Sequence, residues 1–334
     1  MADALQAVAG RRGWIISDGK AGHEAQARGV AEALSLDVEF KRVAPATPWS
    51  WLSPWGPVAP SERFGSDASP FHPPWPDFAF AIGRLTIPYI RRLKQMVGLG
   101  TYSVILLDPK VSPRTADLFW VPEHDKLRGP NVVTTLTGPH TFSASRLAEL
   151  RSRLPADIAA LPSPRVAVLL GGPNGDYRYT PPRVAHLVSA LQSLGALGAG
   201  LLITASRRTP PEITAFVREQ MAWQPHLFWD GEGDNPYPQY LAQADAFVVP
   251  ADSINMTGEP CATGKPIYMF EPEGGSPKFA RFHEALRRHG ATRPLPARFA
   301  RLESWSYPPL DAGPVIAAEI ARRWAKRRQM LGNR

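Results

Sequence analysis

The sequence predicts an α/β protein with two Rossmann-like domains that face each other across a cleft. Three observations favour this fold class. Short apolar runs alternate with helical patterns along the chain, which is typical of parallel sheets covered by helices. The alternation starts again at Val166–Leu170, after a proline-punctuated linker at residues 155–164. The chain has 334 residues, which is enough for two domains.

Composition narrows the class of protein. The chain is 44% apolar and 20% charged, has one cysteine, and lacks any run of about 18 apolar residues. These features predict a cytoplasmic protein without an internal disulfide or a multi-cysteine metal site. The formal charge of +8 favours an anionic partner, such as a phosphorylated ligand or an acidic membrane surface. No nucleic-acid-binding signature is present, so nucleic acid is not an expected partner.

The first domain is expected at residues 1–154. Its apolar runs predict strands at residues 13–17, 38–43, 78–82, 103–107, 118–121 and 131–135. Helices are expected after the first strand, to about residue 34, and at residues 85–97 and 143–154. The glycine-bearing turn at residues 18–23 matches neither a P-loop nor a dinucleotide fingerprint, and it suits a main chain that lies close to a substrate.

An irregular insertion, residues 45–76, interrupts this domain. Its prolines exclude long regular elements, while Trp49, Trp51, Trp55 and Trp75 give it more apolar surface than a disordered linker has. Two interpretations follow. The insertion packs on the core of its own domain, which is the commoner arrangement, or it faces a membrane, where tryptophan favours headgroup depth.

Three side chains of the first domain are candidates for catalytic acid–base chemistry. Asp18 and His23 flank the glycine-bearing turn, and Asp108 follows the strand at residues 103–107. His23 is the candidate general base, because the ordinary histidine pKa of about 6.5 lies near neutrality. The alternatives are an ordinary surface or packed histidine and, for Asp108, an aspartate that starts a turn before Pro109.

The second domain is expected at residues 165–300 and repeats the same plan. Its strands are predicted at residues 166–170, 201–204, 226–229, 247–249 and 267–270. Its helices are predicted at residues 180–194, 213–220, 239–243 and 276–289. The tail at residues 301–334 holds a basic amphipathic helix, residues 316–328, which either packs back on a domain or contacts anionic lipid.

A ligand site is predicted in the second domain, because open α/β sheets bind ligands at the carboxyl ends of their strands. The loops that follow successive strands there carry polar or flexible residues. They contain, in chain order, two glycines, two arginines, a tryptophan and the polar start of a helix. The candidate nucleotide-sugar-binding residues are Gly171, Gly172, Asn174, Arg207, Arg208, Trp229, Asn235, Asp252, Ser253, Asn255, Met256, Thr257 and Glu259.

These residue types suit a phosphorylated sugar ligand, and each has a plainer alternative. Arg207 and Arg208 form a diphosphate clamp, because guanidinium pairs with phosphate oxygens, or else a solvated surface. Asp252 and Ser253 lie at an anion-favouring helix start, or merely cap that helix. Glu259 accepts hydrogen bonds from sugar hydroxyls, or is solvated. No Asp-x-Asp or histidine cluster indicates a metal site.

Together the motifs resemble the elongated-mitochondria family, which comprises the plant mitochondrial fission factor and bacterial homologues usually described as glycosyltransferases. The resemblance covers about residues 13–290 and implies a fold of the GT-B type. The matching segments are SDGKAGHEAQARGVAEAL (17–34), LLGGPN (169–174), TASRRTP (204–210), GDNPY (233–237) and DSINMTGEPCATGKPIYMF (252–270).

A wider similarity, to glycosyltransferases that add N-acetylglucosamine to a lipid intermediate, implies individual roles. By this similarity Glu259 holds the donor ribose, Ser253–Thr257 meet the diphosphate, and the turn with His23 serves the acceptor. Such enzymes work without a bound metal or cofactor, and the nucleotide sugar is their substrate. Pro260 departs from the usual alanine and implies that its helix starts near Thr257 or bends there.

The expected function is therefore transfer of a sugar from a nucleotide-diphosphate donor to a cell-envelope or lipid-linked acceptor. The tryptophan-rich insertion and the basic C-terminal helix favour a peripheral location on the inner membrane face. The alternative is a non-catalytic scaffold or regulator that keeps the same fold, as the resemblance to the fission factor allows.

Overall fold

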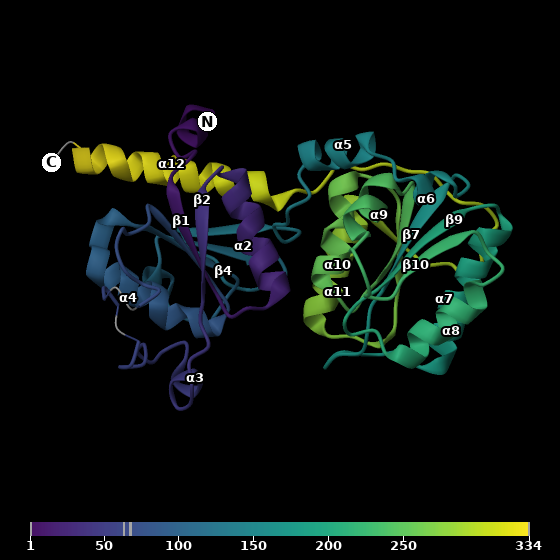
Figure 1. Cartoon of the computed structure of the whole chain (residues 1–334), viewed down its shortest axis with the longest axis horizontal. Helices are drawn as coiled ribbons and strands as arrows, with labels where there is room; N and C mark the ends of the chain where they lie inside the picture. Colours follow the sequence, from purple (N-terminus) through teal and green to yellow (C-terminus); the bar gives the residue numbers. More distant parts are fainter. Residues whose placement is uncertain (1, 63, 67–68, 333–334) are drawn as a thin grey trace. The chain divides into compact units, whose positions relative to one another are not determined.

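The computed structural model describes residues 2–62, 64–66 and 69–332. Contacts divide it into two compact units: unit 1 comprises Met1–Thr141 with Asp311–Arg334, and unit 2 comprises Phe142–Leu310. Each unit is built on its own six-stranded parallel sheet with helices on both faces (Figure 1). The predicted fold class, an α/β protein with two Rossmann-like units, is confirmed. Within the described ranges, no helix is long and apolar enough to cross a membrane.

The sheet of unit 1 runs, in spatial order, through β2 (Asp37–Arg42), β1 (Arg12–Ser17), β3 (Phe78–Ile82), β4 (Tyr102–Leu106), β5 (Leu118–Pro122) and β6 (Val132–Thr135). All neighbouring strands are parallel. The chain proceeds outward from β1 to β2 and then resumes on the other side at β3. This reversal makes a topological switch point at the carboxyl ends of β1 and β3.

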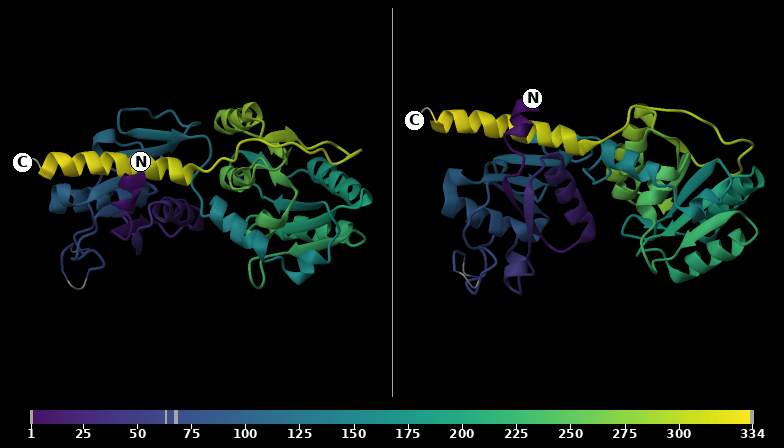
Figure 2. Two further views of the ribbon diagram at one scale, coloured as in Figure 1. Left: turned by 90° about the horizontal axis from the view of Figure 1, so that it is seen from above. Right: turned by 45° about the horizontal axis from the view of Figure 1, so that its top comes forward.

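Helices cover both faces of this sheet because its strands are apolar on both sides. Phe78 and Phe80 of β3 belong to the core under α2 (Ala21–Ala33) and α12 (Ala312–Gly332), whereas Ala79 belongs to the core under α4 (Ile87–Val97). Figure 2 shows α12 lying along the sheet of unit 1. The short helices are α1 (Ala2–Gln6) and α3 (Trp49–Leu52), with 3-10 turns η1 (Arg84–Thr86), η2 (Gly98–Gly100) and η3 (Pro113–Thr115).

The sheet of unit 2 has the same plan. Its spatial order is β10 (His226–Trp229), β9 (Gly200–Ala205), β7 (Arg165–Leu170), β11 (Ala246–Pro250), β12 (Ile267–Phe270) and β14 (Thr292–Pro294), all parallel. The switch point here lies between β7 and β11. A small antiparallel pair, β8 (Tyr177–Arg178) and β13 (Glu273–Gly274), lies outside the sheet. The helices are α5 (Ala144–Ser152), α6 (Ala156–Ala159), α7 (Pro181–Ala196), α8 (Pro211–Met221), α9 (Tyr237–Gln243), α10 (Ile254–Gly258) and α11 (Pro277–His289), with the 3-10 turn η4 (Pro260–Thr263).

Two helices are grouped differently from the domain boundaries expected from the sequence. Helix α5 is part of unit 2, where it contacts α9. Helix α12 (Ala312–Gly332) is part of unit 1, where it contacts α1 and α2. Its predicted apolar stripe of Ile316, Ile320 and Trp324 is buried in the unit 1 core. Burying this stripe stabilises the helix against the unit.

Candidate functional site

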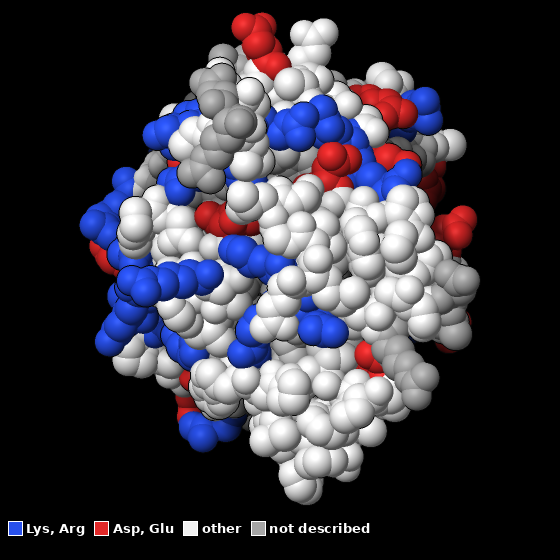
Figure 3. All heavy atoms as spheres, turned by 90° about the vertical axis from the view of Figure 1, so that its left-hand side faces the viewer, with Lys and Arg blue, Asp and Glu red and all other residues white. Residues whose placement is uncertain are grey.

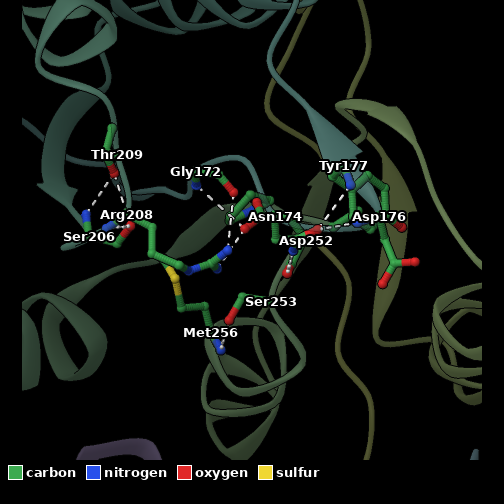
Figure 4. A network of polar contacts seen from close by, with 12 residues as sticks. Gly172, Asn174, Asp176, Tyr177, Ser206, Arg208, Thr209, Asp252, Ser253 and Met256 are labelled. Carbon is green, nitrogen blue, oxygen red and sulfur yellow. Dashed lines mark hydrogen bonds and ion pairs between the residues drawn. The ribbon is translucent and has the colours of Figure 1, made fainter.

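A buried aspartate organises the switch point of the unit 2 sheet. Asp252 follows β11, and its side chain is fully shielded from solvent. Its carboxylate accepts hydrogen bonds from Arg208 Nη2 at 2.7 Å, from the Tyr179 hydroxyl at 2.5 Å and from the Gly172 amide at 3.4 Å. Asn174 donates to the Asp252 carbonyl oxygen at 2.9 Å (Figure 4). One residue therefore fastens together the loops that follow β7, β9 and β11.

The two glycines after β7 are required by this packing. A Cβ on Gly172 would lie 1.9 Å from the carbonyl oxygen of Arg208, and a Cβ on Gly171 would lie 2.2 Å from Oδ1 of Asp252. Both separations are far below van der Waals contact, so only glycine fits. Gly171 and Gly172, which were predicted to bind a ligand, thus lie close to the protein's own main chain and side chains.

The two arginines after β9 differ in their surroundings. Arg208 runs across to Asp252 and also donates through Nη1 to the Gly172 carbonyl oxygen at 3.1 Å (Figure 4). Both terminal nitrogens of Arg208 are thus engaged within unit 2. Arg207 is exposed, lines a pocket, and forms no ion pair with any described residue. Of the predicted diphosphate clamp, Arg207 is the member left available to an anion.

That pocket has a volume of about 460 Å³ and opens at the carboxyl ends of β9 and β10. Its size is in the range of small-molecule sites. Five of the predicted binding residues share it, namely Arg207, Trp229, Asn235, Met256 and Glu259. The pocket thus combines an aromatic ring, a thioether, a cation and a carboxylate in one concave surface.

Glu259 and Tyr237 form a hydrogen-bonded pair in the wall of the pocket. The Tyr237 hydroxyl donates to Glu259 Oε2 at 2.5 Å. Burial raises the pKa of Glu259 to about 7, although the hydrogen bond from Tyr237 acts in the opposite direction. Burial and the neighbouring carboxylate raise the pKa of Tyr237 well above its usual value. Near neutrality the glutamate therefore exists in both protonation states, and its ionised form is an acceptor for ligand hydroxyls.

The segment after Asp252 forms the short helix α10. Ser253 caps it, because its Oγ accepts a hydrogen bond from the Met256 amide at 3.4 Å. Thr257 is fully buried, and its hydroxyl donates to the Ser253 carbonyl oxygen at 2.8 Å. The Thr257 side chain is therefore directed into unit 2, whereas Ser253 and Met256 are partly exposed.

The remaining predicted residues of unit 2 lie in turns beside the pocket. Asn235 accepts a hydrogen bond from the Tyr237 amide at 3.0 Å, and Trp229 Nε1 donates to a carbonyl of its own loop at 2.7 Å. Asn255 is half-buried in α10. The α-helix ends at Gly258 and the 3-10 turn η4 begins at Pro260. The chain therefore changes its helical geometry at the proline, which agrees with the predicted bend.

A hydrogen-bonded acid–histidine pair occupies the switch point of the unit 1 sheet. Asp18 Oδ1 lies 2.8 Å from His23 Nδ1, and Lys20 Nζ donates to Asp18 Oδ2 at 2.8 Å. Burial alone would raise the pKa of Asp18, but the hydrogen bonds from Lys20 and His23 outweigh it and lower that pKa. A Cβ on Gly83, after β3, would lie 3.0 Å from Asp18 Oδ2 and 3.1 Å from His23 Nδ1.

The geometry of this pair determines which histidine nitrogen is available. Because an ionised Asp18 accepts the Nδ1 proton, His23 is held in the tautomer that leaves Nε2 as the basic nitrogen. His23 retains partial exposure, whereas the Asp18 carboxylate is nearly buried. The pair therefore has the arrangement of an oriented general base.

Asp108 is engaged by a residue two positions away. Its Oδ1 accepts a hydrogen bond from the Lys110 amide at 2.9 Å, and its Oδ2 accepts one from Lys110 Nζ at 2.5 Å. This is the turn-initiating arrangement, which the sequence analysis gave as the alternative to an acid–base role. In the described part of the chain, no group of three or more His, Cys, Asp or Glu side chains is placed to hold a metal ion.

Two tyrosines that were not among the predicted site residues complete the unit 2 site. Tyr237 lies at the end of the GDNPY segment and binds Glu259, so that segment was the available signal. Tyr179 donates a hydrogen bond to Asp252, which lies 73 positions further along the chain. No local sequence pattern predicts a contact between residues so far apart. Burial and the charge of Asp252 raise the pKa of Tyr179, which keeps its hydroxyl a hydrogen-bond donor.

Comparison with known proteins gives both a family and a fold. The family model described as "Mitochondrial fission ELM1" matches residues 21–324. The Mitochondrial fission protein ELM1 of Arabidopsis thaliana is 30% identical over 276 residues, which are 75% of this chain and 65% of that protein. The uncharacterized protein RP120 of Rickettsia prowazekii (strain Madrid E) is 30% identical over 161 residues, covering 46% of this chain and 45% of its own. The chain thus spans less than two thirds of the length of either relative.

Among solved structures, the UDP-GlcNAc 2-epimerase from Methanocaldococcus jannaschii is similar over 92% of this chain and 98% of its own, with a TM-score of 0.52 and 8% identity. A likeness at this level of identity concerns the fold. Together with the two parallel six-stranded sheets, it gives the GT-B type of fold that the family resemblance implied.

Proposed function

The chain belongs to the mitochondrial fission ELM1 family, and from this premise we propose that unit 2 binds a nucleotide-diphosphate sugar for transfer to a cell-envelope or lipid-linked acceptor. The observation that carries the proposal is the pocket of about 460 Å³, which joins an arginine that forms no ion pair with any described residue to a carboxylate and two aromatic side chains. The epimerase that shares the fold has a nucleotide sugar, UDP-GlcNAc, in its name. Such a ligand is therefore compatible with a fold of this type.

Each part of a nucleotide sugar would meet matching chemistry in the pocket. Trp229 offers a ring for stacking on the base. Ionised Glu259 would accept hydrogen bonds from the ribose hydroxyls, with Tyr237 fixing its orientation. Arg207 would pair with the diphosphate through its guanidinium. The network of Asp252 would act indirectly, because it holds the surrounding loops in position.

The proposed reaction needs a base for the acceptor, and His23 has the geometry for this role. As the acceptor oxygen forms its bond to the anomeric carbon of the sugar, its proton would pass to Nε2 of His23. The bond from the anomeric carbon to the diphosphate oxygen breaks in the same step, and the diphosphate leaves with the electron pair. Arg207 would stabilise the charge that develops on the leaving group.

Calorimetric titration with UDP, GDP, TDP, CMP and their sugar conjugates tests the donor site. We expect one nucleotide to bind in the micromolar range. Arg207→Ala should weaken it roughly tenfold, because one charge-assisted hydrogen-bonding partner of the phosphates is removed. Arg178→Ala is the matched control, since Arg178 is an equally exposed arginine of unit 2 that pairs with Glu273 and lies outside the pocket. Absence of binding by every nucleotide, or equal losses in both variants, would contradict the assignment.

A non-catalytic scaffold or regulator is the second candidate, and one observation favours it. Asp108 and Arg208, two of the residues predicted to act on ligands, are both occupied by internal partners. A scaffold requires no base at the unit 1 switch point. Nucleotide binding without any turnover of the sugar conjugate would favour this candidate over the transferase, whereas sugar transfer that survives in a His23→Ala variant would contradict only the role of His23.

A further inference from the structure

The insertion at residues 45–76 divides into a packed part and an exposed part. Phe71 is buried, and its ring stacks on Phe64 with centroids 4.5 Å apart. Trp75 packs edge-on against the buried Trp14, at a centroid distance of 5.8 Å. The interpretation that this segment packs on its own domain is confirmed for these side chains. In the first half of the insertion, by contrast, the side chains of Trp51, Leu52 and Trp55 are exposed.

The first half of the insertion forms an exposed apolar projection, residues 49–56, which we call the tryptophan knob. Trp51 is 75% exposed, Trp55 is 67% exposed, and Leu52 between them is 47% exposed. Large apolar side chains gathered in this way on a protein surface usually mark a binding surface. In Figure 1 the knob, at helix α3, projects from the rest of unit 1.

The knob is held in place by two arginines of the neighbouring elements. Arg84 Nη1 donates to the Ser53 carbonyl oxygen at 2.7 Å. Arg91 of α4 donates to the carbonyl oxygens of Trp55 at 3.0 Å and Gly56 at 3.2 Å. These bonds satisfy backbone acceptors of the knob and fix its base to α4. The exposed tryptophans are therefore displayed on an anchored segment.

The charge distribution around the knob is one-sided. Residues 43–61 contain no charged side chain, and neither Arg84 nor Arg91 forms an ion pair with a described carboxylate. Arg92, the next residue of α4, is exposed. Figure 3 shows the lowest part of the view free of charged atoms, with many Lys and Arg side chains and fewer Asp and Glu side chains above it. The knob is thus an uncharged apolar tip whose backbone is bonded by two arginines.

We infer that the tryptophan knob inserts into the interface of a bilayer that contains anionic lipids. Tryptophan is enriched at headgroup depth, where its ring is buried while its N–H remains hydrated. The guanidiniums of Arg84 and Arg91 donate to backbone carbonyls of the knob and form no ion pair with a described carboxylate. Their positive charge therefore matches the negative surface potential of such a bilayer. The tip carries no charged side chain. Such a tip fits into a deformable lipid surface more readily than into a preformed groove on another protein. The inference concerns unit 1 alone and is independent of the nucleotide pocket.

Vesicle co-sedimentation of the full chain tests this inference. Vesicles of phosphatidylcholine mixed with phosphatidylglycerol should bind the protein, and vesicles of phosphatidylcholine alone should bind it more weakly. The double variant Trp51→Ala/Trp55→Ala should lose at least about tenfold in affinity, because the apolar side chains that enter the interface are removed. Arg92→Glu should weaken binding to the anionic vesicles and leave binding to neutral vesicles nearly unchanged.

Trp223→Ala is the matched control, since Trp223 is 94% exposed and lies in unit 2, outside the knob. Its vesicle affinity should equal that of the unmodified protein. The inference is overturned if the unmodified protein binds neither kind of vesicle, an outcome that leaves the knob to a protein partner. It is also overturned if Trp223→Ala loses as much affinity as the double variant. Unchanged thermal unfolding of the variants shows that altered binding does not come from altered folding.

Discussion

The acidic side chains that follow the strands of the two sheets are held in different ways. In unit 1, Asp18 is bonded by residues two and five positions away, and Asp108 by a residue two positions away. In unit 2, Asp252 is bonded by residues 44, 73 and 80 positions away. Unit 1 therefore builds its loops locally, whereas unit 2 joins three loops around one buried charge.

The difference predicts different consequences of mutation. A local turn satisfies its own backbone, so the rest of the unit depends little on it. A buried carboxylate that bonds three loops leaves several groups without partners when it is removed. The switch point of unit 2 is accordingly the more rigid of the two, which suits a site whose ligand-binding loops must be preorganised.

The largest expected effect is that of Asp252→Ala. Its removal leaves the Tyr179 hydroxyl, Nη2 of Arg208 and the Gly172 amide without their carboxylate, and we expect a loss of about 4 kcal/mol in the free energy of unfolding. Urea unfolding followed by circular dichroism measures it. Asp176→Ala is the control, since the Asp176 carboxylate is exposed and points away from the network (Figure 4). A loss no larger than the control's would show that the network does not stabilise unit 2.

The elements of both units were largely evident in the sequence, because strand and helix are determined by local apolar spacing. The strand β3 was predicted at the residues where it occurs, Phe78–Ile82. The short strands β8, β13 and β14 have two or three residues each, too few for a recognisable period. They form through pairing with distant segments, which local spacing cannot show.

The candidate site was less predictable than the fold, for the same reason. Loops at strand ends identified Arg207, Trp229 and Glu259, which the structure brings into one pocket. The sequence did not distinguish Arg207 from Arg208, because that difference depends on Asp252, a residue 44 positions away. In unit 1, where the contacts are local, the turn at Asp108 was among the stated alternatives.

The second prediction concerns the pH dependence that burial gives to unit 2. The pKa of Glu259 is about 7 in the folded chain, against an ordinary value of 4.5. Between these values the unfolded chain releases the proton while the folded chain keeps it, so this group's contribution to stability is complete below about pH 4.5 and is lost as the pH rises through about 7. Glu259→Gln should therefore be more stable than the unmodified protein by up to about 3 kcal/mol at about pH 8, with no difference at about pH 4.5.

Chemical denaturation of both proteins over this pH range measures the effect. Glu273→Gln is the matched control, because Glu273 is an exposed glutamate of unit 2 whose pKa is lowered by the hydrogen bond from Arg178. Its stability difference from the unmodified protein should be small and of opposite sign at high pH. A Glu259→Gln difference that does not vary with pH would mean that the pKa of Glu259 is the same in the folded and the unfolded chain. The contrast between the distant contacts of unit 2 and the local contacts of unit 1 would then have no counterpart in their pH dependence.

The smallest expected effect is that of Asp108→Ala in unit 1. The Lys110 side chain is 71% exposed, and an ion pair of this kind contributes at most about 1 kcal/mol. The Asp108 side chain also satisfies the Lys110 amide, which water can replace at an exposed turn. We therefore expect a loss of about 1 kcal/mol or less in urea unfolding, several times smaller than for Asp252→Ala. A loss as large as that of Asp252→Ala would show that the unit 1 loops depend on one another as those of unit 2 do, and that short sequence separation does not make a loop independent.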